Sequence, residues 1–301
     1  MKTELIDKPA RTRAFSGRSS RLSETAFGCP RNFLGNRFVY AVVSARAQGL
    51  SIGINMNPDK CCNFDCVYCE VDRDIVASEQ RLDVEIMGAE LERTLGMIHS
   101  GQFRDLASYR NVPSELLQLR HVALSGDGEP TLCPNFLEAV EAVVHLRTLG
   151  RFPFFKLVLI TNGSGLDLPG VENAMGIFNA RDEIWAKLDG GTSDYLDRVN
   201  KPDCRMEKVL TSILHLARQR PVIIQSLFPS LDGEEPPESE IEAFVQRLKE
   251  LQAGGAQIAL VQIYSATRPT LHSECGHLSL RSLSRIARRV RDATGLKAEV
   301  F

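Results

Sequence analysis

The chain has 301 residues, of which 43% are apolar and 25% charged, and its 36 Lys and Arg against 38 Asp and Glu give a net charge of −2. These values are typical of an ordinary globular protein and exclude collagen, coiled coil and low-complexity disorder. They also disfavour a dedicated RNA-binding protein, which usually carries a strong basic excess. The longest apolar runs, such as 38–43 and 157–160, are far shorter than the roughly 20 residues that cross a bilayer, so we expect no membrane span.

Residues 1–35 are expected to form a flexible, basic N-terminal tail. Residues 1–21 carry six Lys or Arg against two acidic residues and show no apolar periodicity, which is typical of a solvated segment. The eight cysteines of the chain are too few for a disulfide scaffold, and no positively charged start is followed by an apolar stretch. We therefore expect a cytoplasmic protein with reduced cysteines.

From about residue 49 onward, short apolar runs alternate with segments of helical period. The apolar runs have the length of buried β-strands. The six predicted strands span residues 51–56, 121–125, 155–161, 183–188, 222–227 and 258–264.

Between and after these strands, apolar residues recur every three or four positions, which predicts amphipathic helices packed on a sheet. One of these helices is expected to begin at a capping box, because Ser239 is followed three residues later by Glu242. The apolar stripes consist of Val84, Met87, Leu91, Leu95 and Ile98; Phe136, Val140, Val143 and Val144; Met206, Val209, Leu210 and Ile213; Ile241, Phe244, Val245, Leu248 and Leu251; and Leu283, Ile286, Ala287 and Val290.

The alternation of strands and helices indicates a parallel sheet with helical crossovers. The pattern alone fits either a doubly wound sheet or an incomplete barrel. In both architectures the active site forms at the carboxyl ends of the strands, where polar residues are found in every predicted strand. These residues are Asn55, Asn57, Ser125, Thr161, Asn162, Lys187, Asp189, Gln225 and Gln262.

Three cysteines follow the first predicted strand in C-x3-C-x2-C spacing, namely Cys62, Cys66 and Cys69. Thiolates are soft ligands that favour zinc, copper(I) or iron-sulfur clusters. One short loop can give one thiolate to each of three irons of a four-iron cluster. The fourth iron would then be open to an exchangeable ligand, as the open position of a catalytic zinc is.

Three alternative interpretations exist for this loop. Structural zinc would need a fourth ligand, but the next cysteine is Cys133. Counting from Cys61 gives the C-x4-C-x2-C spacing of plant-type ferredoxins, which need a further cysteine and a small carrier domain. The cysteines could also be inert, although the loop is too polar for a core segment.

The segment CNFDCVYC, residues 62–69, resembles the cluster motif of the radical S-adenosylmethionine (radical SAM) superfamily, with Tyr68 in the aromatic position. Four further segments follow in the superfamily's order, so the resemblance covers most of residues 49–268. The segment SGDGEP, residues 125–130, is similar to the motif that receives the amino group of SAM. The resemblance assigns this role to Gly126, Asp127, Gly128 and Glu129, although glycine is usual at position 127.

Lys187 and Asp189 belong to another of these segments and share one face of the predicted strand 183–188 by period-two alternation. A buried lysine and aspartate would have to pair with each other or contact a charged ligand such as the SAM carboxylate. The SAM contacts that the resemblance implies on these later strands are Thr161 and Asn162, Lys187 and Asp189, and Gln262 and Ile263, the last two through their backbone as a platform for adenine.

The resemblance implies an α/β fold, a partial (β/α)6 TIM-type barrel of parallel strands, with residues 36–270 as its core and residues 271–301 as a C-terminal helix and strand packed on it. It also implies a [4Fe-4S] cluster on Cys62, Cys66 and Cys69, SAM as cofactor or co-substrate, and a flavodoxin- or ferredoxin-like electron donor. One electron would cleave SAM to a 5′-deoxyadenosyl radical that abstracts hydrogen from a nucleoside, a tRNA base or a partner protein. The alternative is a non-catalytic zinc or iron-sulfur protein.

The motifs look most similar to poorly characterised iron-sulfur oxidoreductases related to wyosine-forming tRNA enzymes and, more distantly, to glycyl-radical activases. Two features lie outside the motifs. His272, Cys275 and His277 could hold a second metal, although a loop group without a fourth ligand is more often incidental. The arginine-rich segment 281–291 is expected to be a solvated face that could dock an acidic electron donor or RNA.

Overall fold

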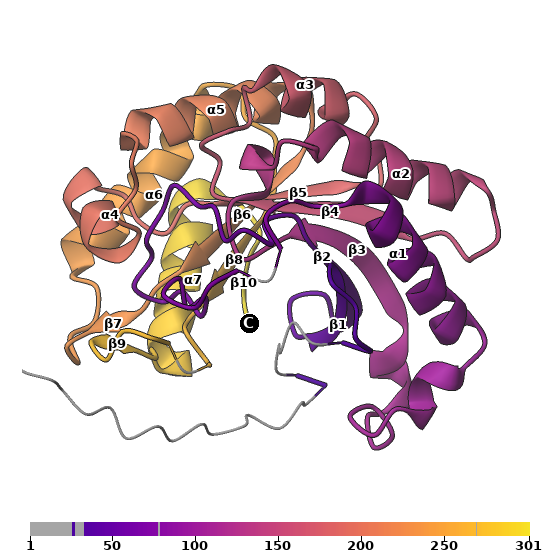
Figure 1. Cartoon of the computed structure of the whole chain (residues 1–301). Helices are drawn as coiled ribbons and strands as arrows, with labels where there is room; N and C mark the ends of the chain where they lie inside the picture. The colour runs from indigo at the N-terminus through magenta and orange to yellow at the C-terminus, as the bar shows by residue number, and fades with distance from the viewer. Residues whose placement is uncertain (1–25, 28–32, 78, 269) are drawn as a thin grey trace, which may run out of the picture.

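The computed structural model describes residues 26–27, 33–77, 79–268 and 270–301 (Figure 1). Most of the segment predicted as a tail, residues 1–35, lies outside the described residues. Two of its described residues, Ala26 and Phe33, are buried in an apolar cluster with Tyr40 and Phe103.

A curved sheet of eight strands forms the centre of the structure. Its strands span Val39–Ser44 (β1), Gly49–Asn55 (β2), Leu119–Ser125 (β3), Lys156–Thr161 (β4), Glu183–Lys187 (β5), Val222–Leu227 (β6), Ile258–Tyr264 (β8) and Ala298–Val300 (β10). They follow one another in the order β1-β2-β3-β4-β5-β6-β8-β10. Only β1 and β2 pair antiparallel; the other neighbours are parallel. The sheet does not close, and β1 and β10 are its two edges (Figure 1).

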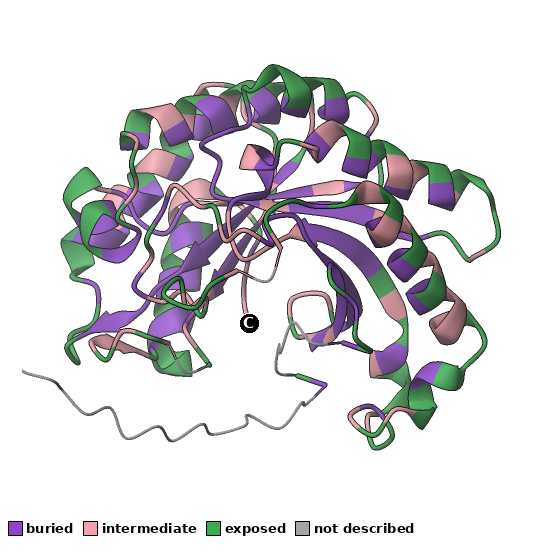
Figure 2. Ribbon diagram, in the orientation of Figure 1, coloured by how far each residue is buried: buried purple, intermediate pink, exposed green. Residues whose placement is uncertain are grey.

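The longer helices lie along the convex side of the sheet with their exposed residues facing outward (Figure 2). The α-helices span Val84–His99 (α1), Phe136–Thr148 (α2), Pro169–Met175 (α3), Ser193–Val199 (α4), Met206–Gln219 (α5), Glu238–Ala253 (α6) and Leu280–Thr294 (α7). Short 3-10 helices span Gln102–Asp105, Ser114–Leu117 and Pro130–Leu132, and Ser230–Leu231 (β7) pairs with Cys275–Gly276 (β9) in a second, small sheet. None of the helices in the described residues is long and apolar enough to span a membrane.

The predicted fold class is confirmed. The six predicted strands correspond to β2, β3, β4, β5, β6 and β8, and the predicted helical stripes lie on α1, α2, α5, α6 and α7. The stripes pack with the strands in one large apolar cluster, as expected for a parallel sheet covered by helices. The resulting arrangement is a partial parallel barrel that is open between β1 and β10.

The predicted capping box at Ser239 is wrong. The N-cap of helix α6 is Pro237, two residues before Ser239, and its side chain caps nothing, so that the helix begins at Glu238. The fixed φ of proline suits a helix start, and acidic residues in the first turn favour the positive end of the helix dipole. One of them, Glu240, is buried and accepts hydrogen bonds from Thr192 N at 3.1 Å and Oγ1 at 2.6 Å.

Strand β1 is outside the six predicted strands and is held by residues far away in the sequence. Glu90 of α1 accepts hydrogen bonds from the backbone N–H groups of residues 37–39 at 2.7 to 3.1 Å. The Tyr40 ring lies against Gly53 of β2, where a Cβ would come within 2.1 Å of it, and the Tyr40 hydroxyl is 2.8 Å from Ser125 Oγ. The strand therefore adds a wall beside the carboxyl ends of β2 and β3.

Candidate functional site

A cavity of about 770 Å³ lies on the concave side of the sheet. Residues from β1, from the loops after β2, β3 and β8, and from β5 line it, so the carboxyl ends of the parallel strands converge here as they do in complete barrels. The predicted site residues that line the cavity are Tyr68, Cys69, Gly126, Asp127 and Lys187.

The three cysteines predicted as cluster ligands lie on the loop after β2, and each sulfur has a polar neighbour. The Cys62 sulfur accepts from the backbone N–H two residues later at 3.5 Å. Asn200 Nδ2 donates to Cys66 Sγ at 3.4 Å, and Arg73 Nη1 donates to Cys69 Sγ at 3.6 Å. Each of these donors would stabilise negative charge on the sulfur.

The donor set of this loop fits an iron-sulfur cluster. Within the described residues no group of three or more His, Cys, Asp or Glu side chains is already arranged around a metal position. Three soft sulfur ligands within residues 62–69, next to a cavity, nevertheless match a cluster that keeps one iron open. Burial raises the pKa of Cys66 to about 12 and also raises the pKa of Cys62, so that metal binding has to displace their protons.

The loop of residues 125–130 packs directly against the cysteine loop, and its glycines make this approach possible. A Cβ on Gly128 would lie 1.7 Å from the backbone oxygen of Cys61, which accepts a hydrogen bond from Glu129 N at 3.1 Å. A Cβ on Gly126 would lie 2.9 Å from Asn57 Oδ1. A larger residue at position 128 would have to move the backbone of the cysteine loop, whereas one at position 126 would first displace the Asn57 side chain.

We expect Gly128→Ala to separate these two loops. The free energy of unfolding should fall by about 1–3 kcal/mol, as in overpacked cores, and the iron retained after anaerobic reconstitution should fall by more than half. Gly96→Ala in α1 is the matched control, because its Cβ would have nothing within 4 Å and alanine favours the helix by up to about 1 kcal/mol. Urea unfolding and iron analysis measure both effects, and equal stability of the two variants would contradict the expectation.

Asp127 stands where the resembled motif has glycine, and the structure gives its side chain a role. Asn55 Nδ2 donates to Asp127 Oδ2 at 2.8 Å, while Asn55 Oδ1 accepts from Asp127 N at 2.9 Å. This pair of hydrogen bonds ties the end of β2 to the loop after β3. Asp127 thus fits the turn and still lines the cavity.

Glu129 does not line the cavity but joins the ends of β3 and β4. Its Oε1 accepts from Thr131 N at 3.1 Å, Thr131 Oγ1 at 2.7 Å and Thr161 Oγ1 at 2.6 Å, and its Oε2 accepts from Asn162 N at 2.7 Å. Burial raises the pKa of Glu129, although these hydrogen bonds oppose the effect. The carboxylate therefore acts as a positioning group for the two loops.

Asn162 also lies outside the cavity lining and holds the cysteine loop in place. Its Nδ2 donates to Asn63 Oδ1 at 2.9 Å. Asn63 in turn donates through Nδ2 to Ser164 Oγ at 3.0 Å and to Asp203 Oδ1 at 2.9 Å. The residue that follows the first predicted ligand is thus fixed to the loops after β4 and α4.

Lys187 and Asp189 form a buried ion pair beside the cysteines. Lys187 Nζ lies 3.2 Å from Asp189 Oδ1 and 4.8 Å from the centre of the Tyr68 ring. Asp189 also accepts hydrogen bonds from the Tyr68 hydroxyl and from Asn200 Nδ2, the latter at 2.7 Å. Burial would lower the pKa of Lys187, but Asp189, Tyr264 and Cys66 together outweigh it and raise that pKa. Because Asn200 also contacts Cys66, the ion pair and the cysteine loop form one network.

Gln262 and Ile263 do not line the cavity. Gln262 is buried and its Oε1 accepts from Gln225 at 2.7 Å, and Ile263 belongs to the main apolar core. The backbone oxygen of Ile263 accepts from Phe301 N at 3.0 Å. The next residues, Tyr264 to Arg268, line the cavity instead.

Several cavity residues escaped the sequence predictions. Ser51 and His121 pair across β2 and β3, and Ser51 Oγ lies 2.8 Å from His121 Nε2. The sequence feature that could have identified both is a polar residue in an otherwise apolar strand. Tyr40 and Arg46 come from the β1 hairpin, which had no motif to mark it.

His121 is expected to make stability depend on pH. Burial, with smaller effects from the positive charges of Lys156 and Arg46, lowers the pKa of His121 from 6.5 to about 3. Below pH 6.5 the unfolded chain binds a proton that the folded chain does not, so stability is lost as the pH falls from about 6.5 toward 3. Between pH 7 and 5 the wild type should lose about 2 kcal/mol more than His121→Gln. Urea unfolding at both pH values measures the difference, and parallel losses would argue against it.

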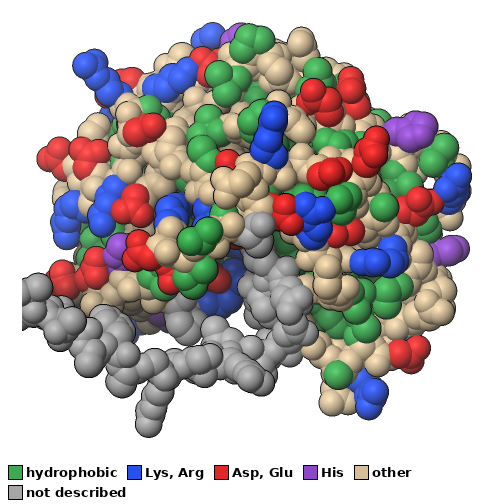
Figure 3. All heavy atoms as spheres, viewed as in Figure 1, with side chains coloured by type: hydrophobic (Ala, Val, Ile, Leu, Met, Phe, Trp, Pro, Cys, Tyr) green, Lys and Arg blue, Asp and Glu red, His purple; other side chains and the backbone are tan. Residues whose placement is uncertain are grey.

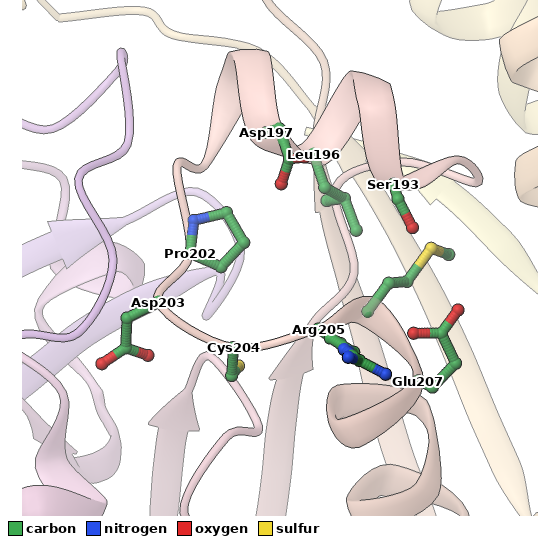
Figure 4. Close-up of a pocket in the computed structure, with 9 residues that line it drawn as sticks. Ser193, Leu196, Asp197, Pro202, Asp203, Cys204, Arg205 and Glu207 are labelled. Carbon is green, nitrogen blue, oxygen red and sulfur yellow. The ribbon is translucent and has the colours of Figure 1, made fainter.

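Other predicted features lie away from the cavity. His272 Nδ1 is 3.4 Å from Glu274, and the described residues around Cys275 and His277 form no metal-binding group. Cys133 is buried in the main core. A second hollow of about 550 Å³ lies between α4 and the start of α5, where Asp203, Cys204 and Arg205 line it (Figure 4).

Charges are mixed rather than gathered on the face that Figure 3 shows, where Lys and Arg alternate with Asp and Glu. On α7, Arg289 pairs with Glu242 at 2.5 Å and Arg285 with Glu235 at 3.5 Å. This pairing agrees with a solvated helix face.

Comparison with known families matches residues 56–248 to the Radical SAM superfamily. A UPF0026 protein of Helicobacter pylori is 27% identical over 187 residues, which cover 60% of this chain and 52% of that protein. A UPF0026 protein of Synechocystis is 30% identical over 179 residues, which cover 58% of this chain and 57% of that protein. The chain thus spans about half the length of the curated relatives that it matches.

Solved structures share the fold at low sequence identity. A radical SAM methyltransferase from Sphaerobacter thermophilus matches with a TM-score of 0.59 and 14% identity over 87% of this chain and 68% of that one. SuiB of Streptococcus suis bound to S-adenosylmethionine matches with a TM-score of 0.55 and 14% identity, over 81% of this chain and 49% of that one. TYW1 with a lysine-pyruvate adduct bound matches with a TM-score of 0.51 and 15% identity, over 82% of this chain and 74% of that one.

Proposed function

The chain belongs to the radical SAM superfamily of enzymes, and we propose that it holds a [4Fe-4S] cluster through Cys62, Cys66 and Cys69 and cleaves SAM reductively in the adjacent cavity. When bound, the cluster would supply the electron that converts SAM to a 5′-deoxyadenosyl radical. Enzymes of this class need a reductant, and we propose a flavodoxin- or ferredoxin-like donor and a reducing, cytoplasmic compartment.

One observation carries this proposal. The loop with the three cysteines is tied at several points to the loops after β3, β4 and β5, and it places Tyr68 and Cys69 on the wall of a cavity. Gly126, Asp127 and Lys187 line the same cavity. This arrangement supports a metal site and a pocket for a charged ligand built from the same elements, as open-iron chemistry would require.

The residues of the chain would orient SAM rather than move protons. The Lys187 cation lies on the cavity wall, where it favours the carboxylate of SAM. The loop of residues 125–130 offers backbone groups beside Gly126. Trp185, Tyr264 and Tyr40 add large side chains to the lining, which exclude water from the space where a reactive radical would act.

The proposed hydrogen abstraction takes place on a substrate that enters the same cavity. The sequence motifs leave a nucleoside, a tRNA base and a partner protein as substrate classes. A non-catalytic iron-sulfur or zinc protein is the competing function, and it predicts metal without SAM cleavage.

The test is anaerobic reconstitution of the full chain with iron and sulfide, followed by addition of SAM and dithionite. We expect about four irons per chain and formation of 5′-deoxyadenosine, measured by liquid chromatography and mass spectrometry. One equivalent of zinc in place of iron, or a full cluster that releases no 5′-deoxyadenosine, would show that the competing function is correct.

A further inference from the structure

A contact across the open side of the partial barrel joins the turn after the edge strand β1 to the end of β8. Arg46 follows β1 and places its guanidinium carbon 4.4 Å from the centre of the Tyr264 ring, at the end of β8. Lys187 Nζ lies 5.4 Å from the same ring. Arg46, Tyr264 and Lys187 all line the large cavity, so the hairpin of β1 and β2 contributes a cation to its interior.

The other cations that line the cavity have partners. Lys187 pairs with Asp189 at 3.2 Å, and Arg268 pairs with Glu70 at 3.0 Å. Lys60 Nζ donates to two backbone oxygens, those of residues 72 and 75. Arg46 has no carboxylate partner among the described residues, and its guanidinium lies against the face of the Tyr264 ring.

The contact of a half-buried guanidinium with an aromatic ring offsets only part of the free energy that the cation loses when water is removed from it. A cation-π contact contributes about 0.5–2 kcal/mol, whereas a paired carboxylate or phosphate would add two parallel hydrogen bonds with the planar fork of arginine. The charge of Arg46 also reaches the interior, because it helps to lower the pKa of His121. The cavity therefore offers one cation that is ready for a ligand.

We propose that Arg46 recognises an anionic group of the substrate, a carboxylate or a phosphate, at the open side of the barrel. This inference rests on the proposed function, because it assumes that the cavity receives the substrate. SAM has a cation nearer to the cysteine loop in Lys187, which lies against Tyr68. Arg46 lies outside residues 56–248 that match the superfamily, as suits a feature that serves the particular substrate of this chain.

The test uses Trp185, the single tryptophan of the chain, which lines the cavity and so reports on binding there. The full chain is titrated with inorganic phosphate and, separately, with acetate at constant ionic strength while tryptophan fluorescence is followed. We expect saturable binding of at least one of these anions. The anion that binds more tightly shows whether the site prefers a phosphate or a carboxylate. Arg46→Gln should weaken it by about 10- to 100-fold, the range of one charge-assisted contact, and Arg46→Lys by less.

Arg120→Gln is the matched control, because Arg120 contacts the same hairpin through the backbone oxygen of Gln48 at 3.0 Å without lining the cavity. Its affinity for the anion should stay within about twofold of the wild type. Circular dichroism confirms that each variant is folded. No saturable binding by the wild type, equal affinity of the wild type and Arg46→Gln, or displacement of the anion by SAM would each overturn the inference.

Failure of this inference is distinguishable from failure of the proposed function. Anion binding is measured without iron, whereas SAM cleavage is measured on the reconstituted wild type. A wild type that cleaves SAM together with an Arg46→Gln variant that binds anions normally refutes the role of Arg46 alone. A wild type that binds anions through Arg46 but never cleaves SAM refutes the proposed function alone.

Discussion

Replacement of Cys66 by alanine is expected to reduce the iron of the reconstituted chain from about four atoms to fewer than one and to abolish 5′-deoxyadenosine formation. The proposed four-iron cluster has three protein ligands, so removal of one would leave two irons without a protein ligand. Of the three sulfurs, that of Cys66 is in contact with Asn200 and through it with Asp189. Iron and sulfide analysis together with electron paramagnetic resonance of the reduced protein measures the loss.

Cys61→Ala is the matched control for this prediction. Cys61 adjoins Cys62 in sequence, its side chain is exposed, and its contact with the neighbouring loop is made by its backbone oxygen. Its alanine variant should therefore keep wild-type iron content and SAM cleavage. Loss of the cluster in Cys61→Ala together with its retention in Cys62→Ala would assign the ligands to the ferredoxin-like spacing instead, because Cys66 and Cys69 belong to both sets.

The parallel strands are predictable from the sequence because each is a short apolar run between helices of clear period. Strands β6 and β8 match the predicted ranges 222–227 and 258–264 to the residue. Strand β1 is harder to predict because its position depends on Glu90, more than fifty residues away. The predicted start of α6 is wrong by two residues because Pro237, rather than Ser239, is the N-cap.

The site is predictable where its residues lie together in a motif and unpredictable where they meet only through the fold. The spacing of the cysteines and the glycines of residues 125–130 is local information. The hydrogen bonds from Asn162 to Glu129 and the contact of Arg46 with Tyr264 join residues far apart in the sequence. A resemblance assigns roles to positions, but only the packed structure shows that Glu129 holds loops and that Tyr264, rather than Gln262, reaches the cavity.

Asp189→Asn is expected to be the most destabilising single change in the site. The Asp189 side chain is fully buried and accepts hydrogen bonds from Tyr68, Asn200 and the backbone N–H of Leu227 at 2.8 Å. Asparagine would leave the Lys187 cation, whose side chain is only 17% exposed, without a negative partner. Breaking a buried ion pair in this way costs about 3–5 kcal/mol. Urea unfolding of the full chain measures the loss, and SAM cleavage should fall with it because Tyr68 and Asn200 lose their common acceptor.

A double-mutant cycle separates the lost pair from a general loss of packing. Lys187→Met removes the cation and keeps most of the volume of the side chain, so Lys187→Met with Asp189→Asn leaves no unpaired buried charge. The double variant should be less destabilised than the sum of the two single variants by about 0.5–3 kcal/mol, the range for residues in direct contact. Additive effects would mean that the charges do not interact in the folded chain. A stability recovered in the double variant without recovery of SAM cleavage would show that the pair is needed for SAM cleavage rather than for the fold.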